Sequence, residues 1–161
     1  MRRAVTELIP YHEFGALTLT RFLGGHPALA AQVTALEDWE YMGHMWVGEG
    51  AGAFTDFLRL ASRPGELGAM TLDFPSLPRP FSEDILDALR LPVRPGMSQN
   101  DITLLLGEPE RRQRFVADRE SLEFTIGQRW PYHVDCTVHE AEGLIYLAVI
   151  RKDILERCSS D

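Results

Sequence analysis

The sequence predicts an α+β fold, an antiparallel β-sheet of at least four strands with short helices packed on one face. Residues 82–91 and 98–106 carry apolar side chains at the spacing of two short amphipathic helices. After them come four segments with the pattern of β-strands, joined by short polar turns: residues 114–117, 122–126, 130–138 and 144–150. Helices this short are unstable alone in water, so their apolar faces require the sheet beneath them.

The helix over 98–106 is the most completely specified element of the chain. Ser98 is placed to accept a hydrogen bond from an amide of the first turn, and Asp101 puts a carboxylate at the helix N-terminus. Gly107 can take the left-handed conformation that ends a helix, and Pro109 prevents the helix from resuming. These signals agree with one another and define both ends of the helix.

The helix over 82–91 repeats this pattern, with Ser82 as its predicted N-cap and Glu83 in its first turn. Pro92 and Pro95 close it. Residues 81–161 therefore read as a helix hairpin followed by a four-stranded antiparallel sheet unit.

The strand over 130–138 has two distinct faces. One set of side chains is apolar and points toward the helices: Trp130, Tyr132, Val134, Cys136 and Val138. The other set points to an open face of the sheet: His133, Asp135, Thr137 and His139. The segment 144–150 is apolar on both faces, which predicts a central strand.

Residues 82–151 resemble a known structural unit. The residues that carry the resemblance are Gly96-Met97-Ser98, Asp101-Ile102 and Leu105-Leu106-Gly107-Glu108-Pro109, followed by the antiparallel strands. This pattern is similar to the helix-pair-plus-sheet unit of the SmpA/OmlA outer-membrane-assembly lipoproteins and of the β-lactamase-inhibitor-protein family. The matching residues are caps and core, so they carry no chemistry. The resemblance implies binding to another protein rather than catalysis.

Residues 1–80 are predicted to form an N-terminal α+β subdomain packed on the rest of the chain. Its expected elements are a strand at 15–22, a helix at 27–39, and strands at 54–60 and 67–74. A helix over 54–61 is the alternative for the third element. Weak similarity between the two halves of the chain allows a second, related layer.

Residues 40–53 are glycine-rich and predict a plain connection. The segment from Gly48 to Ala53 formally resembles a dinucleotide-binding fingerprint, with Asp73 near the position of a ribose-binding acid. The side chain of Glu49 would place a carboxylate beside the pyrophosphate, and no buried parallel strand precedes the pattern. We therefore expect no cofactor.

Charge and cysteine content narrow the class of protein further. The chain carries 16 basic and 24 acidic residues, a formal net charge of −8, which argues against binding to nucleic acid or to an anionic membrane. Arg111, Arg112 and Arg114 form the densest basic cluster, but acidic neighbours make it a mixed-charge edge.

The two cysteines predict reduced thiols, with Cys136 buried and inert and Cys158 in a polar C-terminal tail. No stretch approaches the roughly 18 apolar residues of a membrane span, and polar residues interrupt any signal-like run near the start. The sequence therefore predicts a cytoplasmic protein.

The sequence contains none of the common catalytic or metal-binding motifs. There is no nucleophile elbow, phosphate-binding loop, His-Glu-x-x-His or Cys-x-x-Cys pattern. The histidines are scattered: His12, His26, His44, His133 and His139. The sequence favours a non-enzymatic protein-binding module, inhibitory or immunity-like, with another protein as its partner. A small ligand-binding domain or enzyme with a pocket near Trp39, Tyr41 and Trp46 is the alternative.

The four polar residues of the open face, His133, Asp135, Thr137 and His139, are the candidate partner-binding site. A solvated sheet face is the alternative. A metal ion could be shared by His133 and Asp135, but His139 would lie roughly 20 Å from His133 at about 3.3 Å per residue, so no metal site is predicted. Because histidine titrates between about pH 5 and 8, docking here is predicted to depend on pH.

Overall fold

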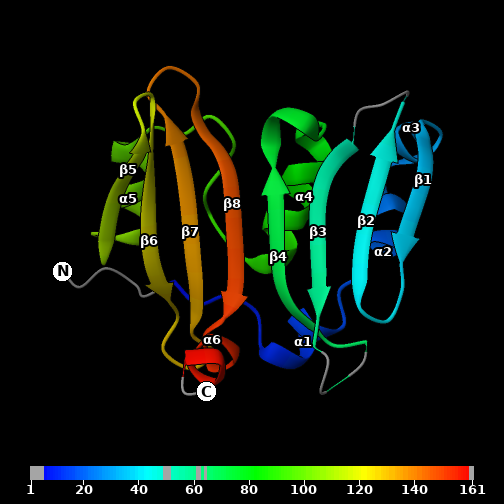
Figure 1. The fold of residues 1–161 in the computed structure, drawn as a ribbon, viewed down its shortest axis with the longest axis horizontal. Coiled ribbons are helices and arrows are strands. Elements are labelled where there is room, and N and C mark those ends of the chain that lie inside the picture. Colours follow the sequence, from blue (N-terminus) through cyan, green and yellow to red (C-terminus); the bar gives the residue numbers. More distant parts are fainter. Residues whose placement is uncertain (1–5, 49–51, 61–62, 64, 160–161) are drawn as a thin grey trace.

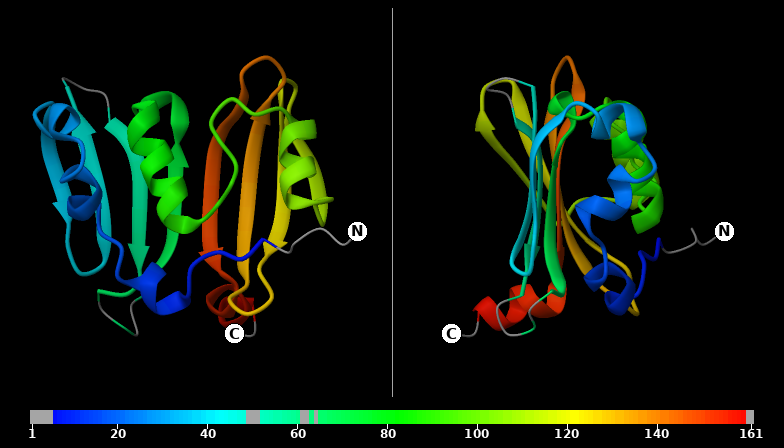
Figure 2. Two further views of the ribbon diagram at one scale, coloured as in Figure 1. Left: turned by 180° about the vertical axis from the view of Figure 1, so that it is seen from behind. Right: turned by 90° about the vertical axis from the view of Figure 1, so that its right-hand side faces the viewer.

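Eight antiparallel strands form one continuous sheet, and helices cover one of its two faces (Figure 1, Figure 2). The computed structural model describes residues 6–48, 52–60, 63 and 65–159. The predicted α+β class is confirmed, as is the placement of the helices on one face. Among the described residues, no helix is both long and apolar enough to cross a membrane.

The N-terminal half supplies three short helices and the first four strands. Its elements are α1 (Tyr11–Gly15), α2 (Leu19–Leu23), α3 (Pro27–Ala30), β1 (Val33–Asp38), β2 (Met42–Val47), β3 (Gly52–Arg59), β4 (Leu67–Asp73) and the 3-10 turn η1 (Phe74–Ser76). The C-terminal half supplies the helix hairpin and the remaining strands. Its elements are α4 (Arg79–Leu89), α5 (Gln99–Leu106), β5 (Arg111–Val116), β6 (Arg119–Ile126), β7 (Tyr132–His139), β8 (Gly143–Arg151) and α6 (Lys152–Ser159).

The strand order is β1-β2-β3-β4-β8-β7-β6-β5, so each half is a four-strand meander whose last strand lies in the middle of the sheet. The two halves meet where β4 pairs with β8, with Met70 opposite Val149. The predicted central position of the last strand is confirmed. Read inward from either edge, the order of strands is the same, and this gives the sheet two matching halves.

The core lies between the sheet and the helices. Phe57, Met70 and Val134 project from the sheet toward the helices and are fully buried, as are Phe81 and Ile85 of α4. Fully burying a side chain of this size contributes about 1.5–3 kcal/mol. The helices are therefore held to the sheet by packing, as their short lengths require.

The chain before α1 ties the two halves together. It runs across the ends of β6, β7 and β8 on the helix-covered side (Figure 2). The buried hydroxyl of Tyr132 donates a hydrogen bond to the Ile9 carbonyl at 2.8 Å. Glu7 accepts one from the Gln128 amide at 2.7 Å. The N-terminal segment is thus packed on the C-terminal half of the sheet.

The prediction of a strand over 15–22 is wrong, because this segment holds the end of α1 and most of α2. The Thr18 side chain accepts a hydrogen bond from the Arg21 amide at 3.2 Å, and this caps α2 at its N-terminus. Leu19, Phe22 and Leu23 are buried together at helical spacing. Their apolar pattern alone is also compatible with a strand. The cap by Thr18 identifies the segment as a helix.

The prediction of a helix over 27–39 is also wrong. Only Pro27–Ala30 is helical, and the chain then enters the edge strand β1. Val33 and Thr34 are β-branched and favour extended backbone, and β1 pairs with β2 with Leu36 opposite Met45. Pairing with a neighbouring strand outweighs the helical pattern of this short segment.

The prediction of a plain connection over 40–53 is wrong, because β2 lies within this segment and β3 begins at its end. Residues 49–51, within the rejected dinucleotide pattern, lie outside the described residues. The predicted strands over 54–60 and 67–74 are confirmed and pair antiparallel as β3 and β4. The alternative of a helix over 54–61 is therefore excluded.

Both helices of the predicted hairpin are confirmed, but only one of the two predicted N-caps is. The Ser98 side chain accepts a hydrogen bond from the Asp101 amide at 3.2 Å. Ser82 instead lies inside α4, buried, because the helix begins earlier, at Arg79, and Pro80 fits its first turn. The polar C-terminal tail is helical, because residues 152–159 form α6; the side chain of Cys158 lies outside the described residues.

Candidate functional site

The face of the sheet opposite the helices is open to solvent, and a row of apolar side chains crosses it. Met42 of β2 lies opposite Leu58 of β3, and Leu58 opposite Ala69 of β4. Ala69 lies opposite Ile150 of β8. We call these four residues the apolar row. It ends at His133 of β7, which lies opposite Ile150.

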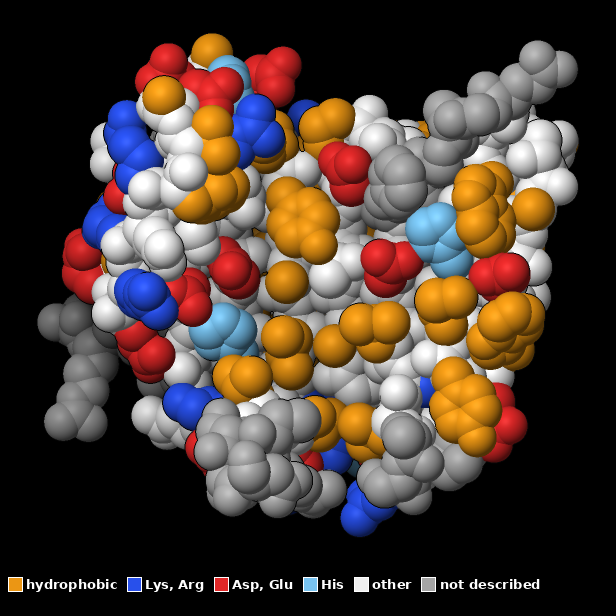
Figure 3. Space-filling view, in the orientation of Figure 1, with side chains coloured by type: hydrophobic (Ala, Val, Ile, Leu, Met, Phe, Trp, Pro, Cys, Tyr) orange, Lys and Arg blue, Asp and Glu red, His pale blue; other side chains and the backbone are white. Residues whose placement is uncertain are grey.

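Large hydrophobic side chains are exposed along this row and beside it. The exposed fraction is 45% for Leu58 and 37% for Tyr146 of β8. It is 54% for Trp39 and 52% for Tyr41, in the turn that precedes Met42. Figure 3 shows hydrophobic side chains gathered across the middle of this face and toward the β1–β2 turn. Exposed apolar groups in such a continuous arrangement are typical of binding surfaces.

The charged groups in the middle of the open face are acidic, whereas Arg111 and Arg119 lie on this face at its β5–β6 edge. Asp56 of β3, Asp73 of β4 and Asp135 of β7 alternate with residues that point into the core. Glu123 of β6 extends this set. Among the described open-face positions of β2, β3, β4, β7 and β8 there is no Lys or Arg. The face therefore combines apolar contact area with negative charge.

In the N-terminal half, His44 of β2 pairs with Asp56 of β3, with 2.7 Å between His44 Nδ1 and Asp56 Oδ1. The ring of Trp46 lies against the imidazole, with 4.4 Å between ring centroids. The sequence identified no partner for His44. The partner comes from the neighbouring strand, so its identity depends on strand register.

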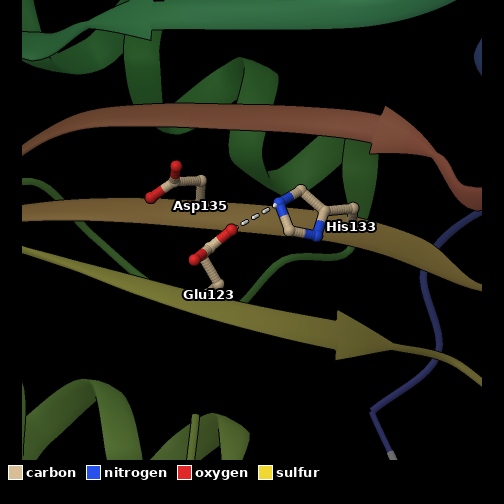
Figure 4. A group of neighbouring side chains, drawn as sticks. All are labelled: Glu123, His133 and Asp135. Atoms are coloured by element: carbon tan, nitrogen blue, oxygen red, sulfur yellow. Dashed lines mark ion pairs between the residues drawn. The ribbon is translucent and has the colours of Figure 1, made fainter. Parts of the chain in front are cut away.

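In the C-terminal half, His133, Glu123 and Asp135 lie close together on two adjacent strands (Figure 4). His133 Nε2 lies 3.5 Å from Glu123 Oε1, and Glu123 lies directly opposite Asp135 in the β6–β7 ladder. Ser121 donates a hydrogen bond to Asp135 Oδ1 at 2.6 Å. Arg111 Nε lies 3.5 Å from the other oxygen of Glu123.

His139 does not belong to this cluster. Its Nε2 lies 3.1 Å from Asp118 Oδ2, and its Nδ1 accepts hydrogen bonds from the amides of Ala141 and Glu142, both at 3.1 Å. A hydrogen bond from Arg119, and a weaker one from His139, lower the pKa of Asp118 below its usual value. His139 therefore holds the turn between β7 and β8.

The structure thus brings together only His133 and Asp135 of the four predicted site residues, with Thr137 farther along the same face. The predicted pH-dependent docking stays a prediction, and replacing His139 would also disturb its turn. Sequence reasoning missed Glu123. The length of the turn between Ile126 and Tyr132 was the signal that could have found it, because that turn sets the register of the two strands.

The alternative pocket near Trp39, Tyr41 and Trp46 does not form among the described residues. Trp39 and Tyr41 are each more than half exposed. Trp46 lies four residues beyond Met42 on β2, about 13 Å away at about 3.3 Å per residue. These three aromatic side chains therefore do not surround a common cavity.

Cys136 and the basic cluster are as predicted. The Cys136 side chain is fully buried on the helix side, and burial strongly raises the pKa of its thiol. Arg112 pairs with Glu108 at 3.3 Å, and Arg114 donates to the Ala117 carbonyl at 3.0 Å. These arginines form a mixed-charge edge along β5.

Comparison of the chain with protein-family models, curated protein sequences and solved structures found no significant match. The resemblance of residues 82–151 to a known unit therefore rests on the residues that carry it.

Proposed function

We propose that this protein is a binding module that engages a partner protein through the open face of its sheet. The observation that carries the proposal is the apolar row, which crosses four adjacent strands on the face away from α1–α5, with α6 only at the lower end of that face (Figure 2). Leu58 and Tyr146 are exposed there, and aromatic or aliphatic side chains of this kind anchor protein interfaces.

The shape of the face suits a protein better than a small molecule. Five strands, from β2 to β7, span roughly 19 Å at about 4.8 Å per strand spacing. A standard protein interface buries about 800 Å² on each partner, so a protein partner would extend over the full width of these strands and along their length. Small-molecule sites, in contrast, are concave and enclose most of the ligand. A broad sheet face offers contact area rather than enclosure.

The charge of the face indicates the chemistry of the partner. Asp56, Asp73 and Asp135 give the middle of the open face negative charge, while Arg111 contacts Glu123 at its edge; the whole chain carries a net charge of −8. Complementary potentials accelerate association and disfavour wrong partners. The partner we propose therefore presents lysine or arginine side chains around an apolar contact. The resemblance of residues 82–151 supports an inhibitory or immunity-like role for such a complex.

The proposal can be tested with two matched variants. Leu58→Asp places a charge in the apolar row, whereas Leu104→Asp places the same charge on α5, on the other side of the sheet. Leu58 and Leu104 are 45% and 62% exposed, so neither change is expected to unfold the chain. Each tagged protein is used to capture partners from the native host at low salt.

A protein recovered by the wild type and by Leu104→Asp, but not by Leu58→Asp, would support the proposal. Its release by moderate salt would support the proposed charge complementarity, because screening weakens interactions between exposed charges. Equal recovery by Leu58→Asp would contradict binding through the open face. Circular dichroism and thermal unfolding of all three proteins check that the fold is retained.

A further inference from the structure

Three potential metal ligands lie on two adjacent strands whose register holds them in place. The β6–β7 ladder is unbroken from Arg119 opposite His139 to Ile126 opposite Tyr132. Within it, one nitrogen or oxygen atom from each of Glu123, His133 and Asp135 lies within 4.8 Å of the other two. Figure 4 shows the Glu123 carboxylate directed toward the imidazole of His133, with Asp135 beside them and its carboxylate turned away.

The arrangement leaves negative charge incompletely compensated. Glu123 and Asp135 are directly opposite each other, and like charges in such cross-strand pairs are destabilising. Arg111 contacts Glu123 at 3.5 Å, but its side chain is 66% exposed, so it offsets little of this repulsion. Lys152 is bound to Thr125, at 2.9 Å, rather than to either carboxylate. A cation between the carboxylates would remove this repulsion.

The carboxylate of Asp135 is also oriented from outside the cluster. Ser121 donates to its Oδ1 at 2.6 Å, which leaves Oδ2 with free electron pairs. Outer partners that orient a ligating side chain are a regular feature of metal sites and strengthen them. The side chains of His133 and Glu123 are only 20% and 22% exposed, so the strands and their neighbours restrict both.

We propose that Glu123, His133 and Asp135 bind one divalent transition-metal ion, and that Zn²⁺ fits this ligand set. One imidazole nitrogen with two carboxylate oxygens suits Zn²⁺, whereas Mg²⁺ and Ca²⁺ prefer oxygen ligands alone. With bonds of about 2.0–2.2 Å, ligand atoms around a tetrahedral Zn²⁺ are about 3.4 Å apart. The separation of 3.5 Å between His133 and Glu123 already matches, and Asp135 closes the set by rotation of its side chain.

The other half of the sheet supplies a natural control. His44 and Asp56 make the same kind of histidine–carboxylate contact, at 2.7 Å. There the imidazole also faces the ring of Trp46. Among the described residues, the grouping of three ligating side chains forms only around His133. The proposal stands apart from the proposed binding function, since the isolated chain should bind the ion without a partner.

The test is isothermal titration calorimetry of the metal-free full chain with ZnCl₂ at neutral pH. A Cys158→Ser background removes the second thiol as a competing ligand. The wild-type cluster should bind one equivalent of Zn²⁺. Asp135→Asn and His133→Ala should each raise the dissociation constant at least about tenfold. His44→Ala should leave it unchanged.

Two outcomes would overturn the proposal: no saturable Zn²⁺ binding by the wild-type cluster, or binding that Asp135→Asn and His133→Ala both leave unaltered. Asp135→Asn keeps the shape of the side chain and an oxygen that accepts from Ser121. This variant therefore tests Zn²⁺ binding by the cluster even if His133→Ala folds poorly. Mg²⁺ is titrated in parallel, and equally tight Mg²⁺ binding would overturn the assignment to a transition metal. Histidine ring NMR signals provide a second readout, with His133 shifting and His44 not.

Discussion

The two halves of the sheet have the same strand order but present different chemistry on the open face. In the N-terminal half, His44 lies between Asp56 and the ring of Trp46, and Leu58 is exposed beside them. In the C-terminal half, His133 lies beside two carboxylates. The position of a histidine–carboxylate pair is common to both halves. The neighbouring residue differs: Trp46 makes the surface beside His44 aromatic, whereas Asp135 adds a third potential metal ligand beside His133.

The matching strand order explains why these pairs occur where they do. Counted from the edges, β2 corresponds to β6 and β3 to β7. One pair joins β2 to β3 and the other joins β6 to β7. The histidine lies on β2 in the first half but on β7 in the second, so the two types of residue are exchanged. The register of the two strands determines which histidine and carboxylate meet, and the histidine can lie on either strand of the two.

The largest expected effect concerns the cores beneath the two halves. Phe57 on β3 and Phe124 on β6 are both buried. Replacing either with alanine should lower the free energy of unfolding by about 3–5 kcal/mol, because each change leaves a cavity. Because one sheet and the Tyr132–Ile9 hydrogen bond join the halves, both variants should lower the midpoint of one shared transition.

The measurement is urea unfolding followed by circular dichroism and by tryptophan fluorescence. Coincident curves from the two probes are the expected result for a cooperative unit. Two separate transitions, each sensitive to only one of the two substitutions, would show that the halves unfold independently.

A smaller effect is expected at the helix caps, where the halves should behave alike. Thr18 caps α2 and Ser98 caps α5, and each accepts a hydrogen bond from a backbone amide at 3.2 Å. Thr18→Ala and Ser98→Ala should each lower the free energy of unfolding by about 1 kcal/mol. Urea midpoints at constant slope measure this, with Thr103→Ala inside α5 as the control. If either substitution lowers the free energy of unfolding by less than the experimental error, the cap at that position does not stabilise the fold.

The smallest effect should have opposite signs in the two halves. Asp135→Asn relieves the repulsion from Glu123, so in metal-free buffer it should raise the free energy of unfolding by about 0.5 kcal/mol. Asp56→Asn weakens the contact with His44 and should lower the free energy of unfolding by about 0.5 kcal/mol. Paired urea titrations at pH 7 resolve the signs. If both substitutions change the free energy of unfolding in the same direction, the proposed contrast between repulsion at Asp135 and attraction at Asp56 is wrong.

Local signals were enough to predict the helix hairpin and the four strands of the C-terminal half, but not the start of α4 or the helix α6. Ser98 and Gly107 mark the ends of α5, and the alternation from Tyr132 to His139 shows both faces of β7. These signals act over a few residues and do not depend on distant contacts. The early helices and β1 were missed because such short segments give too few residues for periodicity to separate helix from strand.

The candidate site depends on contacts that no local pattern contains. Glu123 meets Asp135 across two strands, and His44 meets Asp56 in the same way. Both contacts require the register of a strand pair, which the turn and the packing of the core determine together. The roles of His139 are hidden for a different reason, because two of its partners are backbone amides. Sequence reasoning could therefore find the open face but not the grouping on it.

The most direct measurement of binding through the open face is site-specific photo-cross-linking in the native host. A photoreactive phenylalanine analogue replaces Tyr146 on the open face in one protein and Leu104 on α5 in another; the two native side chains are 37% and 62% exposed. Binding through the open face predicts a discrete protein adduct from position 146 and none from position 104. An adduct from position 104 alone, or none from position 146, would contradict it.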